Sequence, residues 1–481
     1  MARGERPAWR PLGLIAGGTA LVMFLLSGRY GFHRDELYYM VAGRHPAWGY
    51  DDQPPLAPLW AGLTETVAHA WPEPLQLMLL RLPSTLAVAG VILLTGAIAY
   101  EMGGDRRAQL IAALAIAVTP VLAVGGHLLS TTVFDILAWT ALAYIFARWI
   151  RTRADGLLLW LGPVAGLGLL VKTLPLVYAF GIVVGLLISG PREIFRRWQL
   201  WAGGAIAVIL WAPNVWWQAA HGWPQLKMTA VIRDDADWGG RAGLIPFQIL
   251  LLSAAIVVWL PGLVRLLRNP DARPWRTLGW AYLIVVVVVL ATGGREYYPA
   301  GAYPALIAAG SLAIGASWAT IRTWAAVQAV ATLLLGLPVY PVGWLHKTPQ
   351  PAINYDAGET AGWPALADQV RAVRAGLPDT TVILAGNYGE AGALIHYGLP
   401  NVYSGHLAFW RWGPPPDALN GPVIAVGYGE DDLRGECGSV ELAARIDNRL
   451  NLDNDEQGTP VWICRQPRRA WSQVWPELYH M

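Results

Sequence analysis

Charged residues are scarce in this chain: Asp, Glu, Lys and Arg make up 14 % of 481 residues, whereas 55 % are hydrophobic. This composition, with a mean hydropathy of +0.38, excludes an ordinary soluble protein. The formal net charge is only +2, so the overall charge gives no indication of a nucleic-acid partner. We therefore predict a polytopic α-helical membrane protein.

Cysteine is nearly absent, since Cys437 and Cys464 are the only two, and both lie in the polar C-terminal stretch. They form a disulfide if that stretch faces an oxidising compartment, or pack as two free thiols that behave as small hydrophobes. The sequence leaves both alternatives open.

Sequence motifs for bound cofactors are also lacking. No H-x-x-x-H or similar spacing accompanies the residues whose oxygen or imidazole groups could bind a metal, and we expect no required metal and no other cofactor. The glycines of the C-terminal stretch do not form a G-x-G-x-x-G pattern, and we interpret them as turn and close-packing positions. The metal candidates are His33, Asp35, Asp51, Asp52 and His127, and the glycines are Gly386, Gly389, Gly392 and Gly398.

Long apolar runs are abundant. Crossing the hydrocarbon core takes about 20 apolar residues, and we count about eleven candidate spans. They lie near residues 11–28, 77–100, 108–125, 131–148, 157–172, 173–190, 200–217, 244–264, 277–293, 303–319 and 324–343.

Arginines cluster in alternate loops between these spans, and all the clusters share one side of the membrane if the N-terminus is cytoplasmic. The C-terminus is then external, as are residues 29–75, the turn at Lys172 and residues 295–303. The clusters are Arg3, Arg6 and Arg10; Arg106 and Arg107; Arg148, Arg151 and Arg153; Arg192, Arg196 and Arg197; and Arg265, Arg268, Arg273 and Arg276.

Charged residues return after about residue 345, where β-like runs alternate with a helix-like segment. The runs are 381–386, 421–428 and 459–465, and the helix-like segment is 362–377. We predict a transmembrane domain over 1–344, with a long first external loop at 29–75, and a small extracytoplasmic α/β domain over 345–481.

The stretch "GFHRDELYYM" places Asp35 and Glu36 just after the first span. An acid at the bilayer centre costs about 2.5–3.5 kcal/mol, so acids near a membrane usually face a cavity or a partner. Alternatively, these two are solvated loop residues paired with arginines nearby, namely Arg29, Arg34 or Arg44.

The same loop continues as "HPAWGYDDQPPLAPLW" over residues 45–60. It adds Asp51 and Asp52, and then a Pro-Pro pair that fixes an extended or turned backbone. Because the loop is aromatic and amphipathic, we expect it to lie along the membrane surface.

Asp135 and Lys172 are two further polar residues at the predicted external edge. Asp135 is either a functional acid or a buried acid satisfied by the hydroxyls of Ser130, Thr131 and Thr132. Lys172, between two apolar spans, either extends to the interface or binds a phosphate.

Arginine and aromatic residues recur on the same side. Arg295, beside Tyr297 and Tyr298, is either part of an interfacial aromatic belt or an anion clamp. A second aromatic group lies in the C-terminal domain, where it either packs in the core or stacks on a glycan. Its members are Tyr403, Phe409, Trp410 and Trp412.

Carboxylates and cations are thus predicted on one external face. A departing lipid phosphate needs cations, and an acceptor hydroxyl needs a carboxylate base within hydrogen-bond reach. Transfer of a sugar from a polyprenyl-phosphate donor would use both.

Five segments, in this order, resemble the protein mannosyltransferase and lipid A aminoarabinose transferase family of the GT-C glycosyltransferases. The resemblance covers about residues 10–345, and the first segment is the most specific. The segments are "FHRDELYYMVAGRHPAWGYDDQPPLAPLW", "LLSTTVFDILAW", "GLGLLVKTLP", "WAPNVWWQAAHGWP" and "GGREYYPAGAYPALIAAG".

The resemblance implies an inverting transfer from a polyprenyl-phosphate sugar to a lipid, glycan or protein acceptor at the outer face of the cytoplasmic membrane, without a metal cofactor. Asp35 would be the base and Asp135 the second acid. Related aminoarabinose transferases have a lysine directly before Pro-Pro, where this chain has Gln53. The expected substrate-binding residues are Glu36, Asp52, Gln53, Lys172, Arg295, Tyr297 and Tyr298.

Two other functions are alternatives to glycosyl transfer. A transporter or flippase of a lipid-linked substrate should have ionisable residues at mid-bilayer and broken helices in matched halves, whereas here the acids gather on one face. An inactive scaffold should have lost Asp35 or Asp135, and both are present.

Overall fold

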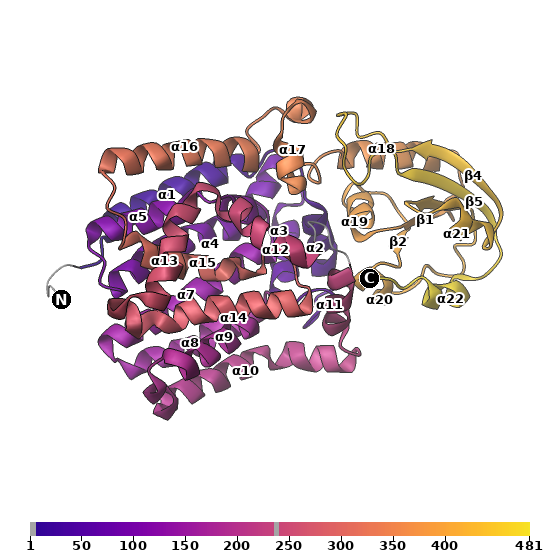
Figure 1. Cartoon of the computed structure of the whole chain (residues 1–481). Coiled ribbons are helices and arrows are strands. Elements are labelled where there is room, and N and C mark those ends of the chain that lie inside the picture. Colours follow the sequence, from indigo (N-terminus) through magenta and orange to yellow (C-terminus); the bar gives the residue numbers. More distant parts are fainter. Residues whose placement is uncertain (1–5, 235–239) are drawn as a thin grey trace. The chain divides into compact units, whose positions relative to one another are not determined.

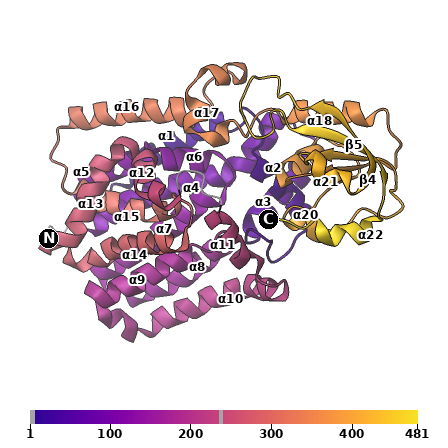
Figure 2. The same ribbon diagram turned by 45° about the vertical axis from the view of Figure 1, so that its right-hand side comes forward.

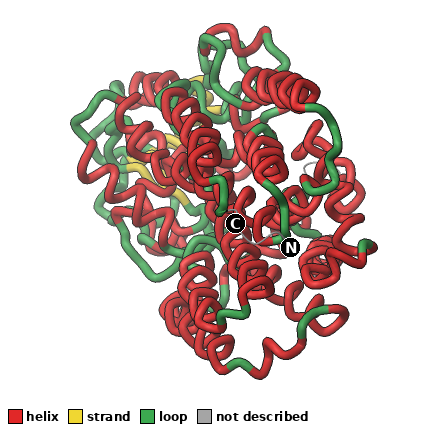
Figure 3. The backbone as a smooth tube through the Cα atoms, turned by 90° about the vertical axis from the view of Figure 1, so that its left-hand side faces the viewer, coloured by secondary structure: helices red, strands yellow, loops and turns green. Residues whose placement is uncertain are grey.

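The computed structural model describes residues 6–234 and 240–481, so Arg3 of the first arginine cluster lies outside the described residues. Figure 1 shows a mostly helical chain, and Figure 3 shows that strands occur in only one region. The chain forms two compact units, and the second contains most of the first loop together with the C-terminal segment. Unit 1 is Met1–Leu26, Gln53–Leu56 and Arg81–Leu333, and unit 2 is Ser27–Asp52, Ala57–Leu80 and Leu334–Met481.

Unit 1 is a bundle of apolar helices. In the described residues, seven helices are long and apolar enough to cross a membrane, and the bent pair Arg106–Ala117 and Pro120–His127 would make an eighth. Two shorter apolar helices, Asp155–Leu169 and Pro175–Ser189, coincide approximately with the predicted spans at 157–172 and 173–190. The chain is a multi-pass membrane protein, as predicted, but the predicted span 303–319 is helical in α15 only over Tyr303–Ser311.

The bend between α5 and α6 has a local cause. Thr119 precedes Pro120, the first residue of α6, and the pair bends by 56°. Proline lacks the N–H group that would continue α5, whereas its fixed φ suits the first turn of a new helix. One hydropathic run therefore folds as two helices.

The described helices of unit 1 are α-helices and short 3₁₀ helices (η). In chain order they are α1 (Trp9–Leu26), α4 (Glu73–Glu101, from Arg81 onward), α5 (Arg106–Ala117), α6 (Pro120–His127), α7 (Thr131–Thr152), η1 (Asp155–Trp160), α8 (Leu161–Leu169), α9 (Pro175–Ser189), η2 (Arg192–Arg196), α10 (Trp198–Ala220), α11 (Pro224–Asp234), α12 (Gly240–Leu252), η3 (Ser253–Ala255), α13 (Ile256–Arg268), η4 (Pro270–Trp275), α14 (Arg276–Thr292), η5 (Tyr298–Ala302), α15 (Tyr303–Ser311) and α16 (Trp318–Gly336).

Small residues allow close helix packing in unit 1. Helices α9 and α14 lie side by side in Figures 1 and 2. A Cβ at Gly181 of α9 would lie 2.9 Å from the Ala281 carbonyl oxygen of α14. Such contacts are typical of helix packing in membranes, where apolar burial gives little driving force.

Three of the predicted basic loops lie at one end of unit 1. Asp135 lies near the start of α7, and Arg148 follows 13 residues later, about 20 Å along the helix axis. The loops at the Arg148 end are joined by ion pairs, so the arginines gather at the end of α7 away from Asp135. The pairs are Arg148 and Arg151 with Glu101, Arg153 with Glu193, and Arg197 with Asp155.

In unit 2, helix α2 (Arg34–Arg44) packs between α3 (Leu56–Ala68) and α19 (Tyr388–His396). Gly43 and Gly62 bring α2 and α3 together, because a Cβ at Gly43 would lie 2.5 Å from the Gly62 Cα. A Cβ at Gly392 of α19 would lie 3.0 Å from the Leu37 backbone. The loop that carries the conspicuous acids is therefore a packed part of unit 2.

A mixed five-stranded sheet in unit 2 has the order β2-β1-β3-β5-β4. Strand β1 pairs in parallel with β2 and β3, and β5 pairs antiparallel with β3 and β4. The three predicted β-runs are confirmed as β1 (Val382–Ala385), β3 (Val423–Val426) and β5 (Pro460–Pro467), and the predicted helix is α18 (Trp363–Arg374). The fold prediction of a helical membrane protein with a small C-terminal sheet domain is thus confirmed.

Strands β2 (Val402–Ser404) and β4 (Cys437–Arg445) were not predicted. Unit 2 also contains short helices before, between and after the strands. They are η6 (Val342–Lys347), α17 (Gln350–Ile353), η7 (Tyr355–Ala357), α20 (Ala408–Arg411), α21 (Glu430–Arg434), α22 (Trp471–Val474) and η8 (Trp475–Glu477).

The two cysteines form a disulfide, which decides between the two alternatives left open by the sequence. Cys437 in β4 and Cys464 in β5 have Cα atoms 5.5 Å apart and lie 27 residues apart in sequence. The bond joins the edge strand of the sheet to its neighbour.

We expect the stability of unit 2 to depend on pH through the carboxyl group of Glu390. Burial raises its pKa from 4.5 to about 7, although hydrogen bonds from the Asn387 and Gly386 N–H groups lower it. Between these two pH values the folded state binds the extra proton, so stability falls as pH rises, by about 3 kcal/mol for this group. Glu390→Gln keeps the acceptor oxygen without the charge and should make the loss of stability between pH 5 and 7.5 smaller than in the parent protein, measured by urea unfolding followed by tryptophan fluorescence.

The matched control is Glu441→Gln on exposed β4, which should keep the slope of the parent protein. An unchanged slope in Glu390→Gln would show that Glu390 is not the group that titrates.

Candidate functional site

The start of α2 positions two of the predicted acids. Glu36 Oε2 accepts a hydrogen bond of 2.8 Å from the His33 N–H, which closes a capping box. Glu36 is fully buried by this contact, whereas the Asp35 side chain is 36 % exposed. Glu36 therefore serves to begin the helix, and its predicted substrate contact stays a prediction.

Asp35 and Asp52 are each held by a tyrosine in unit 2. The Tyr388 hydroxyl donates to Asp35 Oδ1 at 2.8 Å, and the Tyr38 hydroxyl donates to Asp52 Oδ1 at 2.8 Å. The two tyrosine rings lie 5.2 Å apart, centre to centre. The structure thus joins both acids through one pair of packed rings.

The arginines proposed as partners of the loop acids bind elsewhere. Arg29 donates to the Val339 and Tyr340 carbonyl oxygens, Arg34 pairs with Asp455, and Arg44 pairs with Glu65. Glu36 is buried in α2, so its interpretation as a solvated loop residue is wrong.

Asp52 interacts with the charge of Asp35 and has a raised pKa. Burial raises the pKa of Asp52 to about 7, and the charges of Asp35 and Asp51 add to this, while the hydrogen bond from Tyr38 lowers it. A carboxyl group poised near neutrality next to a second carboxylate is typical of sites that transfer protons.

Asp51 directly precedes Asp52 in the chain. The local sequence alone does not show that the two acids have different partners. Asp51 is fully buried, and Arg411 donates to both of its oxygens at 2.7–2.9 Å. The Tyr479 hydroxyl donates to it as well, at 3.2 Å. Since Arg411 follows 360 residues later, no local pattern could have revealed this ion pair.

In unit 1, Lys172 and two tyrosines form a cation–aromatic cluster. The Lys172 ammonium lies 5.0 Å from the centre of the Tyr297 ring and 5.1 Å from that of Tyr298. The two rings meet edge to face at 5.2 Å. The structure therefore brings together three of the residues that sequence assigned to a phosphate and its lipid.

Asp135 has a different partner from the hydroxyls considered above. Its Oδ1 accepts a hydrogen bond of 2.8 Å from Trp139 Nε1, one helical turn later, and only 4 % of the residue is exposed. Ser130 instead donates to the Gly125 carbonyl oxygen. The charge of Lys172 interacts with Asp135, which links this acid to the cation–aromatic cluster.

Gln53 belongs to unit 1 and is 4 % exposed. Both polar atoms of its amide are buried, with no hydrogen-bond partner among the described residues. Leaving such a group unsatisfied costs about 1–3 kcal/mol, so its presence favours a ligand that completes the bonding.

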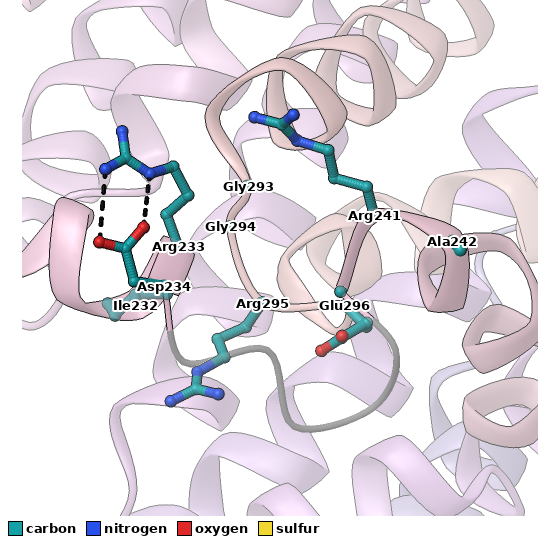
Figure 4. Close-up of a pocket in the computed structure, with 10 residues that line it drawn as sticks. Ile232, Arg233, Asp234, Arg241, Ala242, Gly293, Gly294, Arg295 and Glu296 are labelled. Carbon is teal, nitrogen blue, oxygen red and sulfur yellow. Dashed lines mark hydrogen bonds and ion pairs between the residues drawn. The ribbon is translucent and has the colours of Figure 1, made fainter.

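Arg295 lines a pocket of about 580 Å³ in unit 1. Figure 4 shows its side chain beside Glu296, with Arg241 and the Arg233–Asp234 ion pair around the same hollow. The lining thus holds three guanidinium groups and two carboxylates, and Arg233 is paired with Asp234.

The aromatic group of the C-terminal segment is partly buried. Phe409 is buried, and Trp410 and Trp475 each donate an indole N–H to the other's carbonyl oxygen. Trp412 stacks on His45 at 4.5 Å and remains partly exposed. No group of three or more His, Cys, Asp or Glu side chains in the described residues is arranged to hold a metal ion.

Part of the chain matches a known protein family. Residues 52–217 match the family model described as dolichyl-phosphate-mannose-protein mannosyltransferase. No curated protein sequence matches the chain.

Solved structures give a likeness over nearly the whole length. ArnT from Cupriavidus metallidurans bound to undecaprenyl phosphate is 16 % identical, with a TM-score of 0.62, over 94 % of this chain and 97 % of that one. Its apo form gives the same values. The arabinofuranosyltransferase AftD from Mycobacteria is 12 % identical, with a TM-score of 0.54, over 97 % of this chain but 40 % of its own.

The predicted resemblance is confirmed by these comparisons. The chain is a GT-C-fold protein, similar to protein mannosyltransferases over residues 52–217 and to ArnT in the fold of nearly its whole length.

Proposed function

We propose that this protein is an inverting glycosyltransferase that moves a sugar from a polyprenyl-phosphate donor to an acceptor at the outer face of the inner membrane. The acceptor is a lipid, a glycan or a protein. The N-terminus is cytoplasmic in this proposal, and the ends of the helices near Asp135 and Lys172 face outward. The family match and the likeness to an undecaprenyl-phosphate complex support the donor class.

One observation carries the proposal: the Lys172 ammonium, flanked by Tyr297 and Tyr298 within a bundle of apolar helices. A lipid-linked phosphate brings negative charge to the edge of the bilayer and a long apolar chain beside it. An ammonium matches the phosphate, and two aromatic rings at this level suit the first isoprene units. The unsatisfied Gln53 amide adds a hydrogen-bonding group in the same unit.

The reaction proceeds in a single displacement. Asp35 accepts the proton of the acceptor hydroxyl, whose oxygen attacks the anomeric carbon from the face opposite the phosphate. The bond between that carbon and the phosphate oxygen breaks, and polyprenyl phosphate leaves with the electron pair. Lys172 stabilises the charge that develops on the leaving group, with Arg295 as a second cation, while Asp52 binds near the sugar and Asp135 is the second acid.

Purified protein in nanodiscs, offered a panel of polyprenyl-phosphate sugars, is expected to release polyprenyl phosphate from at least one donor. Lys172→Gln should lower kcat/KM for that donor by about a hundredfold, because a positive charge at the leaving group is lost. The matched control is Lys347→Gln, an exposed lysine of unit 2 that should keep the parent rate. Transport of an intact lipid-linked sugar without release of polyprenyl phosphate would instead support the transporter function.

A further inference from the structure

Tyr388 lies at the start of α19, a helix of the C-terminal segment whose first turn is held by hydrogen bonds. It is the first residue of α19, which begins with a complete capping box. Asn387 Oδ1 accepts from the Glu390 N–H at 2.8 Å, and Glu390 Oε2 accepts from the Asn387 N–H at 3.2 Å. A helix start held from both directions gives the tyrosine backbone little freedom.

Helix α19 is also locked against α2, the helix that carries Asp35. A Cβ at Gly392 would lie 3.0 Å from the Leu37 backbone, and one at Gly389 would lie 2.9 Å from the Arg34 Cβ. A side chain larger than glycine would not fit at either position, so the two helices are in close contact here. The distance between the Tyr388 hydroxyl and Asp35 is therefore set by backbone packing.

The Tyr388 ring is held on several sides. The Arg34 guanidinium lies 5.5 Å from its centre, and the rings of Tyr38 and His406 lie at 5.2 and 5.1 Å. Burial raises the pKa of Tyr388 well above its ordinary value, and the nearby charge of Asp35 adds to this. The phenol therefore remains protonated and serves as a permanent hydrogen-bond donor.

The hydrogen bond from Tyr388 engages only one of the two carboxylate oxygens of Asp35. Oδ1 accepts from Tyr388, whereas Oδ2 lies 4.0 Å from His33 Nδ1, beyond hydrogen-bond distance. A side chain fixed through one oxygen presents the other in a defined direction, which is what a general base requires.

We propose that Tyr388 is a positioning residue for Asp35, by which the C-terminal segment orients the carboxylate that accepts the proton of the acceptor hydroxyl. This inference rests on the proposed function. It gives the C-terminal segment a direct part in catalysis, separate from any contact with the acceptor.

Tyr388→Phe is the test, because it removes the hydroxyl and keeps the ring. We expect kcat to fall about tenfold, as for one hydrogen bond to a charged group, with the KM for the donor unchanged. The acid limb of the pH–rate profile should move to higher pH, since a carboxylate that loses a donor is protonated more readily. Tyr397→Phe is the matched control, because its hydroxyl donates to Glu73 Oε2 at 3.3 Å at the other end of the same helix.

A second measurement does not depend on turnover. Labelling of Asp35 by a water-soluble carbodiimide, followed by mass spectrometry, should be faster in Tyr388→Phe than in the parent protein and in Tyr397→Phe. Equal labelling rates in all three proteins, or an unchanged pH–rate profile in Tyr388→Phe, would overturn the positioning role. Absence of donor turnover in the parent protein would contradict only the proposed function, and the labelling rates would still decide whether Tyr388 holds Asp35.

Discussion

Asp35→Asn is expected to lower kcat for polyprenyl phosphate release by about a thousandfold, while the donor still binds. A positioned general base contributes about 10²–10⁴ to a rate, and asparagine has the size of aspartate but cannot take the proton. The Tyr388 hydroxyl can still donate to the amide oxygen, so the helix start should keep its structure. The measurement is single-turnover release of polyprenyl phosphate in nanodiscs, together with donor binding.

The matched control is Asp368→Asn, an exposed acid on α18 of the same unit that pairs with Arg371. It should turn over at the parent rate. Parent-like turnover in Asp35→Asn would contradict the assignment of the base and move attention to Asp52, whose pKa near 7 makes it the next candidate. Loss of donor binding in Asp35→Asn would instead indicate that Asp35 contacts the donor.

Local sequence patterns predicted the elements of this fold that depend on local physics. Apolar runs of span length became helices, and the runs 381–386, 421–428 and 459–465 became β1, β3 and β5. Strand β4 was not predicted because its side chains are mostly exposed and include Glu441 and Arg445. Its sequence therefore lacks the alternation of apolar and polar residues that is typical of a half-buried strand. Within the predicted span 303–319, α15 is helical only over Tyr303–Ser311.

The candidate site was predictable in its residue types but not in its contacts. Acids and cations at a membrane edge are costly, so their presence alone singled out Asp35, Asp52, Asp135 and Lys172. Their partners depend on tertiary structure, since Tyr388 lies 353 residues after Asp35. Only Glu36 had a local signal of its structural role, because an acid three residues after a helix-capping residue is typical of a capping box.

The ion pair of Asp51 and Arg411 leads to the largest expected effect on stability. Asp51 is fully buried, and Arg411 donates to both of its oxygens. Arg411→Met keeps most of the side-chain volume but leaves a buried charge without its cation, which should lower the free energy of unfolding by about 3–5 kcal/mol. Thermal unfolding of the purified protein in detergent measures this loss, and the loop beside Asp52 should become susceptible to proteolysis.

Removing both charges separates the cost of an unpaired charge from the value of the pair. Asp51→Asn combined with Arg411→Met should recover most of the lost stability, because replacing a whole buried ion pair is often nearly neutral. The matched surface control is Arg371→Met, whose partner Asp368 is 54 % exposed, and it should cost about 0–1 kcal/mol. If Arg411→Met unfolded at the same temperature as Arg371→Met, the loop acids would be held in place by helix packing through Gly43, Gly62 and Gly392 rather than by this ion pair.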